Sequence, residues 1–478
     1  MLSGANCIKA LEPIQIISSK DGGPYGLKTK LGWYIIGPID GNNRRELCCN
    51  RIAVRQADTD KIGKHYFHAR NKLQETDVKE MLNKIYNEEF AENNHGHNNM
   101  KNEMSQDDKK FMKILETETI LINGHYQVPL PFRDTNINLP CNRYQAEKRL
   151  SYLVKKFGKN EKIKNDYFEF MQNIISKGYA RKAIKETSPG QCWYFPHHGV
   201  YHPRKPDKIR VVFDLSAEYK GRCLNRELLS GPDLTNQIIG VLLRFREEQV
   251  AVMGDIEGMF NQVKVPDDHC GFLRFLWWDD SDTSKDVIDY EMTAHVFGGS
   301  SSPSCSNYAL RKTAADNIKE YGEMVAGILE RNFYVDDMLK SFETATKATK
   351  IIKQVKALCS KGGFNLTKFI SNNADVLKSI PEQHRRQNVK DADLLFGSLP
   401  EDRALGVKWN IENDTVGFQI KLTDNPLTRR GLLSMLSSIY DPLGLGAPFM
   451  LKGRLIIQQL CRDKLEWDDS IGESAVIE

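Results

Sequence analysis

The sequence of 478 residues has few of the features that mark secreted, membrane-bound or disulfide-stabilised proteins. No run approaches the roughly 18 apolar residues of a membrane-spanning helix, and the N-terminus lacks a basic segment followed by an apolar core. The ten cysteines form no CxxC pair and show no metal-ligand spacing, so reduced intracellular thiols are expected instead of disulfides. His197, His198 and His202 lie close in sequence, but no cysteine stands at ligand spacing, which favours packing or nucleic-acid contact over zinc.

The chain also lacks a large excess of one charge. Its formal net charge of +4 is too small to identify a nucleic-acid-binding protein. The distribution of the charge is more informative. Residues 141–230 contain 19 Lys and Arg against nine Asp and Glu, so the rest of the chain is net acidic. A basic region ahead of an acidic centre suits an enzyme that acts on a polyanion. A solvated helical surface, notably at residues 155–164, is the alternative explanation for part of this charge.

Two adjacent carboxylates interrupt the apolar run FYVDDML at residues 333–339. Neighbouring side chains of a β-strand point to opposite faces, so Asp336 and Asp337 converge on one point only where the chain turns. We therefore predict a hairpin with both residues at its tip. Carboxylates held together repel, and one pKa should rise unless a cation lies between them. Taken alone, the motif fits a solvated Asp-Asp turn better than a metal site.

A third carboxylate, Asp255, ends the apolar run at residues 250–253 and precedes a helix-like turn. A strand-terminal Asp together with an Asp pair at a hairpin tip can hold two divalent ions about 4 Å apart for in-line phosphoryl transfer. Mg²⁺ is the expected ion, with Mn²⁺ as a substitute, because Mg²⁺ prefers oxygen ligands and keeps positions open for phosphate oxygens. Asp255, Asp336 and Asp337 are therefore the predicted catalytic and metal-binding residues.

At these residues the sequence resembles the palm of a reverse transcriptase, and its wider pattern resembles the Bel-Pao class of retrotransposon polyproteins. The matching blocks are YFPHH at 194–198, RVVFD at 210–214, DIEGMF at 255–260, FG at 297–298 with SSP at 301–303, YVDD at 334–337 and DPLGL at 441–445. The resemblance implies an α+β right-hand polymerase of fingers, palm and thumb, preceded by a β-rich protease remnant. The implied activity is RNA-directed DNA synthesis by two-metal nucleotidyl transfer.

The resemblance also implies roles for individual side chains. Lys208 and Arg210 would hold the triphosphate of the incoming nucleotide, a task that suits the planar fork of an arginine. Phe260 would be the aromatic gate that excludes the 2′-hydroxyl of a nucleotide, with a plain core residue as the alternative. Gly406 and Trp409 would belong to a hairpin that grips the primer end, although Trp409 fits a core position equally well.

A Gly/Ser loop leading into a helix carries three more residues that the resemblance assigns to nucleotide binding, namely Gly298, Ser302 and Pro303. Such a loop permits close backbone approach to a nucleotide. Retroviral enzymes usually carry Gln immediately before this glycine, whereas the present sequence has Phe297. The contact to the nucleotide at this position is therefore expected to differ.

The length predicts two to four domains, and the resemblance sets their approximate limits. The expected parts are the C-terminal remnant of a retropepsin-like aspartic protease (1–45), a polar linker (46–105), an N-terminal extension with the fingers (106–250), the palm with the primer-grip-like hairpin (251–420), and the start of the thumb or connection, a segment of the Pao retrotransposon peptidase family (421–478).

The implied partners are a primed RNA or DNA template and deoxynucleoside triphosphates, with RNase H and integrase regions farther along the polyprotein. The implied location is the cytoplasm, in virus-like particles, with a nuclear stage. Two other functions fit the sequence less well: the aspartic peptidase of the polyprotein, and a non-catalytic nucleic-acid-binding relic.

Overall fold

The computed structural model describes residues 15–17, 25–29, 32–36, 104–184, 190–202, 205–386, 401–417 and 425–471. The chain divides into two units, residues 1–100 and 101–478, and each is described here by itself. The expected linker at 46–105 lies outside the described residues except for its last two positions. Within the described part of the chain, no helix is long and apolar enough to cross a membrane.

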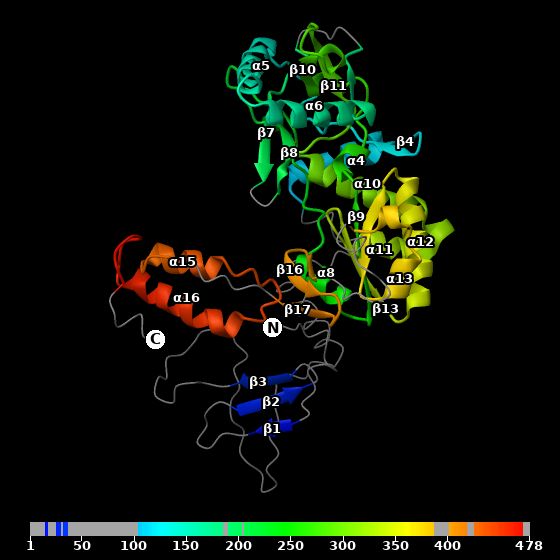
Figure 1. Ribbon diagram of the computed structural model, residues 1–478. Coiled ribbons are helices and arrows are strands. Elements are labelled where there is room, and N and C mark those ends of the chain that lie inside the picture. The colour runs from blue at the N-terminus through cyan, green and yellow to red at the C-terminus, as the bar shows by residue number, and fades with distance from the viewer. Residues whose placement is uncertain are drawn as a thin grey trace, which may run out of the picture. The chain divides into compact units, whose positions relative to one another are not determined.

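The first unit contains an antiparallel sheet of three strands in the order β1-β2-β3 (Figure 1). The strands are β1 (Gln15–Ile17), β2 (Tyr25–Thr29) and β3 (Gly32–Ile36). Ile16 pairs with Leu27, and Leu27 pairs with Tyr34. The described residues of this segment are therefore β-strands, as expected of the β-rich part at 1–45, while the origin of this part in a protease remains an interpretation.

The second unit is built around a four-stranded antiparallel sheet in the order β12-β13-β9-β14. Its strands are β9 (Val250–Ile256), β12 (Phe333–Tyr334), β13 (Asp337–Phe342) and β14 (Leu366–Ser371). The uninterrupted apolar run in β9 is explained by burial on both faces. Val250 and Val252 face one hydrophobic core, whereas Ala251 and Met253 face another.

Three helices cover the first face of this sheet: α10 (Ser302–Asp316), α11 (Ile318–Arg331) and α12 (Ala345–Lys361) (Figure 1). In α12, the Thr344 side chain caps the N-terminus by accepting a hydrogen bond from the Lys347 N–H. The sequence predicts one helix over residues 304–321. The structure instead ends α10 at Asp316, because Asn317 leaves the helical conformation, and it also kinks α11 at Gly322, where φ is 81°.

The other face packs against α8 (Ile238–Phe245) and a small antiparallel sheet. That sheet consists of β15 (Glu401–Ala404), β16 (Val407–Asn410) and β17 (Thr415–Gly417). The two-residue turn between β15 and β16 has positive φ at both Leu405 and Gly406, as hairpins with tight twist require. The hairpin predicted at residues 404–409 is therefore confirmed.

A second layered region forms around a core that is rich in aromatic residues. Its sheet has the order β10-β11-β6, and a separate hairpin joins β7 to β8. These strands are β6 (Ala180–Lys182), β7 (His197–His202), β8 (Lys205–Phe213), β10 (Arg274–Trp278) and β11 (Val287–Met292). The amphipathic spacing of residues 144–157 and 163–178 predicts two helices, and the structure has them as α5 (Arg143–Phe157) and α6 (Glu161–Ser176).

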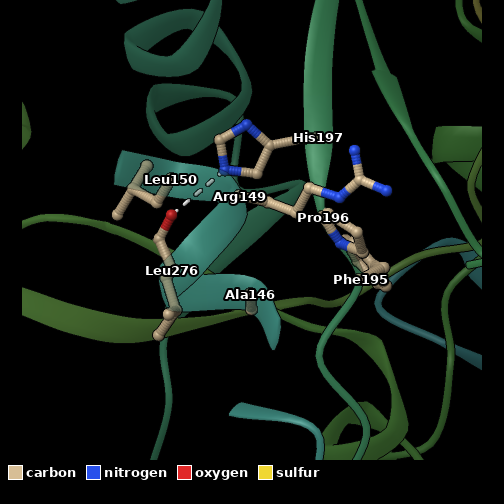
Figure 2. A pocket seen from close by; sticks show the side chains of 7 residues that line it. All are labelled: Ala146, Arg149, Leu150, Phe195, Pro196, His197 and Leu276. Atoms are coloured by element: carbon tan, nitrogen blue, oxygen red, sulfur yellow. Dashed lines mark hydrogen bonds between the residues drawn. The ribbon is translucent and has the colours of Figure 1, made fainter. Parts of the chain in front are cut away.

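His197 belongs to this aromatic core and borders a cavity of about 10 Å³, which has room for one water at most (Figure 2). Its Nε2–H donates to the Leu276 carbonyl, so Nδ1 accepts from the Tyr167 hydroxyl in the neutral ring. Burial lowers the pKa of His197 to about 4. Of the two expected roles, packing and nucleic-acid contact, the buried and fully bonded ring of His197 has the packing role.

Shorter elements complete the second unit: α4 (Gln106–Glu118), β4 (Ile120–Ile122), β5 (His125–Gln127), α7 (Leu224–Glu227), α9 (Met259–Gln262), the 3₁₀ turns at Cys270–Leu273, Asp279–Ser281 and Glu382–His384, and α13 (Ala374–Lys378). The described residues 425–471 contain α15 (Arg429–Ser437) and α16 (Ala447–Arg462). The break between these two helices falls at Asp441-Pro442, as the sequence predicts.

Candidate active site

Asp255 and Asp337 face each other directly across β9 and β13. The Ile256 N–H donates to the Asp336 carbonyl at 2.9 Å, which makes Asp255 and Asp337 a non-hydrogen-bonded pair of the antiparallel ladder. Side chains approach most closely in pairs of this type, where the Cα atoms are about 4.5 Å apart. By the alternation along β9, Asp255 shares the sheet face of Ala251 and Met253, which is the face that α8 covers. The two carboxylates thus share one face at one end of the sheet.

Asp336 reaches the same corner through the turn of the hairpin. Tyr334 pairs with Asp337, so Val335 and Asp336 form a two-residue turn. Val335 has a φ of 55°, a conformation that costs energy for a β-branched residue and that concentrates at functional sites. The predicted hairpin is therefore present, with Asp336 at its tip and Asp337 already in the strand.

The electrostatics of this corner are unfavourable for three ionised carboxylates. Burial, followed by the charges of Asp336 and Asp255, raises the pKa of Asp337 to about 6. Burial, followed by the charge of Asp255, also raises the pKa of Asp336. The sequence predicts at least one raised pKa in this group, and both shifts have the predicted direction.

Lys368 is a residue of this corner that the motifs do not reveal. Its ammonium lies 2.7 Å from an Asp255 carboxylate oxygen. Lys368 lies where the pairing of β14 with β9 shifts register, and its φ is 51°. Lys368 is two residues from each of the buried Leu366 and Ile370, so regular alternation along the strand would point its side chain into the core. The bulge turns the lysine away from the core instead. The sequence signal that could have revealed this residue is a lysine at a strand position where the alternation predicts a buried side chain.

The carboxylates fit a divalent cation by their chemistry, since hard oxygen donors suit Mg²⁺ and Mn²⁺. Their side chains are not arranged as a finished ligand set. Among the described residues, no three His, Cys, Asp or Glu side chains are placed so that they could together hold a metal ion. One Asp255 oxygen faces Lys368 instead. Binding of a metal here therefore requires side-chain rotation, including at Asp255.

Phe260 lies in α9, directly after the turn that follows β9. This helix begins after Gly258, whose φ of 55° allows the sharp change of direction. Phe260 is 7% exposed, and its ring lies 4.5 Å from that of Phe297, which is 60% exposed. Phe260 belongs to none of the three hydrophobic cores, whereas its neighbours Met259 and Val263 do. It is a buried residue that lies beneath an exposed ring, outside these three clusters.

The Gly/Ser loop is held against the end of β8. Gly298 has a φ of 96°, and a Cβ atom there would lie 3.0 Å from the Phe213 carbonyl oxygen, so the position requires glycine. The Asn225 side chain fixes the loop by donating to the Gly298 carbonyl and accepting from the Ser300 N–H. Asn225 carries no motif signal, and its role appears only when the two segments meet.

The other predicted nucleotide contacts differ in accessibility. Ser302 is buried at the start of α10, while Pro303 in the first turn is exposed. Lys208 and Arg210 are exposed on β8, where Arg210 pairs with Val200. Among the described residues, no hydrogen bond or ion pair joins either cation to the three carboxylates. The structure thus brings the carboxylates, α9, the loop and the end of β8 together, and leaves the two cations farther along β8.

Trp409 is a core residue. It is completely buried, its ring packs edge-on against Phe245, and its Nε1–H donates to Asp414 at 2.9 Å. Direct contact of this ring with a primer, as the sequence allows, is therefore ruled out in this conformation. Gly406 lies in the exposed turn of the hairpin, where a Cβ atom would lie 2.8 Å from the Tyr440 ring.

The C-terminal segment has a recognisable family. Residues 428–478 match the family model described as the Pao retrotransposon-like RNaseH-like domain. The Pao family is the expected one for this segment, and the description of the family model names an RNaseH-like domain where the resemblance gives the peptidase-family name. No curated protein matches the chain.

Solved structures that are similar to the chain include two complexes of a viral enzyme. One is the foamy viral protease–reverse transcriptase dRH in complex with ds DNA, at 16% identity and a TM-score of 0.43 over 73% of this chain. The other is the foamy viral protease–reverse transcriptase in complex with RNA/DNA hybrid, at 17% identity and a TM-score of 0.36 over 69% of this chain. The chain spans 48% and 35% of the lengths of these two proteins.

Proposed function

We propose that this chain is the RNA-directed DNA polymerase portion of a Bel-Pao-like retrotransposon polyprotein. The observation that carries the proposal is the convergence of Asp255, Asp336 and Asp337 at one end of the central sheet, where two of the three have raised pKa values. Perturbed carboxylates grouped in this way are typical of catalytic sites. Divalent ions bound there would activate the primer 3′-oxygen and neutralise charge on the phosphates.

In this proposal, Asp255 and Asp336 would hold both Mg²⁺ ions, and Asp337 would complete or electrostatically support the site. Mn²⁺ can replace Mg²⁺. The primer 3′-oxygen attacks the α-phosphorus of a deoxynucleoside triphosphate, and pyrophosphate leaves. The chain orients the reactants, since a polymerase works mainly by positioning and electrostatic stabilisation.

The nucleotide is held by elements that meet at this corner. Phe260 lies beneath the sugar, and its support by Phe297 keeps the ring in place. The Gly298 loop, fixed by Asn225, forms a wall beside the base. Arg210, assisted by Lys208, would hold the triphosphate from the exposed side of β8. The Leu405-Gly406 turn supports the primer end through its backbone, because the Trp409 ring is buried.

The proposed partners are a primed RNA or DNA template and deoxynucleoside triphosphates, in a virus-like particle in the cytoplasm with a nuclear stage. The direct test is primer extension on poly(rA)/oligo(dT) with Mg²⁺ or Mn²⁺, comparing the wild type with Asp336→Asn. The substitution preserves size and removes one ligand charge, so we expect at least a ~10²-fold loss of extension rate.

A matched control is Asp282→Asn, which makes the same change at an exposed loop carboxylate that caps Ser284. This control should retain wild-type extension, and both variants should bind the primed template equally. An Asp336→Asn enzyme within a few-fold of wild type would remove Asp336 from the site.

A further inference from the structure

The helix α5 presents two distinct faces. Ala146, Leu150, Leu153 and Phe157 are buried against the aromatic core. At about 100° per residue, Tyr144, Lys148, Tyr152 and Lys155 fall within one sector of about 80° on the opposite side. These four residues alternate aromatic and cationic side chains, and together they are called the Tyr/Lys face.

Both tyrosines of the Tyr/Lys face are unusually accessible for aromatic side chains. Tyr144 is 67% exposed and Tyr152 is 56% exposed. The Lys148 ammonium lies 5.9 Å from the Tyr144 ring centroid, and the Lys155 ammonium lies 5.6 Å from the Tyr152 ring centroid. Each ring is thus paired with one cation.

The Tyr/Lys face carries positive charge that no carboxylate of the described residues neutralises through an ion pair. The acidic residue of α5, Glu147, lies on a flank of the helix and pairs with Arg143. Arg149 and Lys156 add two exposed cations on the other flank. Within the described part of the chain, no ion pair involves Lys148, Lys155, Arg149 or Lys156. An accessible surface of stacking rings and uncompensated cations is complementary to the bases and phosphates of a nucleic acid.

The spacing of the rings indicates which form of nucleic acid fits. Tyr144 and Tyr152 are eight residues apart, which corresponds to about 12 Å along the helix axis. Consecutive bases of a regular stacked strand are about 3.4 Å apart. Two bases of one strand can therefore stack on the two rings only if the strand is unstacked and extended between them. A duplex offers no free base faces.

We propose that the Tyr/Lys face of α5 binds a single-stranded nucleic acid by stacking bases on Tyr144 and Tyr152, while Lys148 and Lys155 contact its phosphates. The inference rests on the proposed function in one respect: it identifies the bound strand with the unpaired part of the template. This surface lies on α5 and is distinct from the carboxylate corner, the Gly298 loop and β8.

The test is the binding of fluorescein-labelled oligo(rU) and oligo(dT) to the full chain, followed by fluorescence anisotropy at several salt concentrations. The double variant Tyr144→Ala/Tyr152→Ala should bind at least tenfold more weakly, whereas Tyr144→Phe/Tyr152→Phe should stay within twofold of wild type. Lys148→Gln/Lys155→Gln should weaken binding and reduce the salt slope by about 1.4, as expected for two lost phosphate contacts to a single strand.

A matched control for charge is Lys350→Gln/Lys353→Gln, which removes two exposed lysines from α12 and should leave binding within twofold. Thermal midpoints equal to wild type establish that the exposed substitutions do not affect folding. A labelled blunt duplex should lose little affinity in the alanine variant. An equal loss of affinity for oligo(rU) and oligo(dT) in the alanine variant indicates that the rings stack on the bases without recognising the sugar.

Three results would overturn the inference: single-strand binding by the alanine pair within twofold of wild type, a phenylalanine pair as weak as the alanine pair, or an equal loss for the duplex. The proposed function fails separately. If the chain never extends a primer but the alanine variant loses single-strand binding, the proposed function fails and the inference about the Tyr/Lys face stands. If the chain is an active polymerase and the alanine variant binds single strands as the wild type does, only the inference about the Tyr/Lys face is refuted.

Discussion

The carboxylates of the candidate active site should make the folded chain less stable at neutral pH, and Asp337→Asn tests this directly. Burial and the charges of Asp336 and Asp255 raise the pKa of Asp337 from 3.8 to about 6. This rise in pKa corresponds to about 3 kcal/mol of unfavourable free energy in the folded state when the Asp337 carboxyl group is ionised. Asp337 retains some solvent contact and is coupled to its neighbours, so we expect Asp337→Asn to raise the free energy of unfolding by ~1–3 kcal/mol.

The effect should depend on pH in a defined direction. Above about pH 6, the wild-type carboxylate is charged in the folded protein, and the full penalty is present. As the pH falls from 6 toward 3.8, the folded state takes up a proton that the unfolded state does not, so the wild type gains stability. The advantage of the variant should therefore be complete near pH 7.5 and disappear near pH 4.

Urea unfolding of the wild type and the variant between pH 4.5 and 8.0 measures this difference, with Asp282→Asn as a control that should show no such trend. Addition of Mg²⁺ at pH 7.5 should reduce the advantage of the variant, because metal binding stabilises the ionised wild type. A variant that is no more stable than wild type at pH 7.5, or a difference that does not change with pH, would refute this account of the site.

Three further outcomes are expected. Lys368→Met removes the ammonium that faces Asp255. Because an exposed ion pair contributes about 0.5–1 kcal/mol, the affinity for Mn²⁺, measured by electron paramagnetic resonance, should rise about two- to fivefold. Weaker Mn²⁺ binding by the variant would contradict the idea that the lysine competes with the metal for Asp255. Phe260→Val should increase the ratio of ribonucleotide to deoxynucleotide incorporation at least ~10-fold in single-nucleotide extension, and an unchanged ratio would return Phe260 to a packing role. Trp409→Phe should lower the free energy of unfolding by ~1–3 kcal/mol while primer affinity stays at the wild-type value. Unchanged stability together with weaker primer binding would show instead that Trp409 contacts the primer.

The local elements of the candidate active site follow from short-range sequence patterns. An apolar run that ends in Asp255 forms β9, because burial on both faces selects a continuous apolar strand. Two adjacent carboxylates between apolar residues mark the β12–β13 hairpin, with Asp336 in its turn and Asp337 as the first residue of β13. The direction of the pKa shifts was predicted from the repulsion of like charges, but burial is the larger cause of both shifts and comes from the tertiary structure.

The partners of these residues were decided by the tertiary structure. Lys368 reaches Asp255 from 113 positions along the chain, and the contact depends on a register shift in β14. Asn225 fixes the loop around Gly298 from another segment, and Trp409 is buried because α8 supplies Phe245. The sequence by itself determined which segments carry carboxylates, turns and strands, because those depend on neighbouring residues. The pairing of distant side chains depends on sheet register and on packing between layers, and these are set only when the whole unit folds.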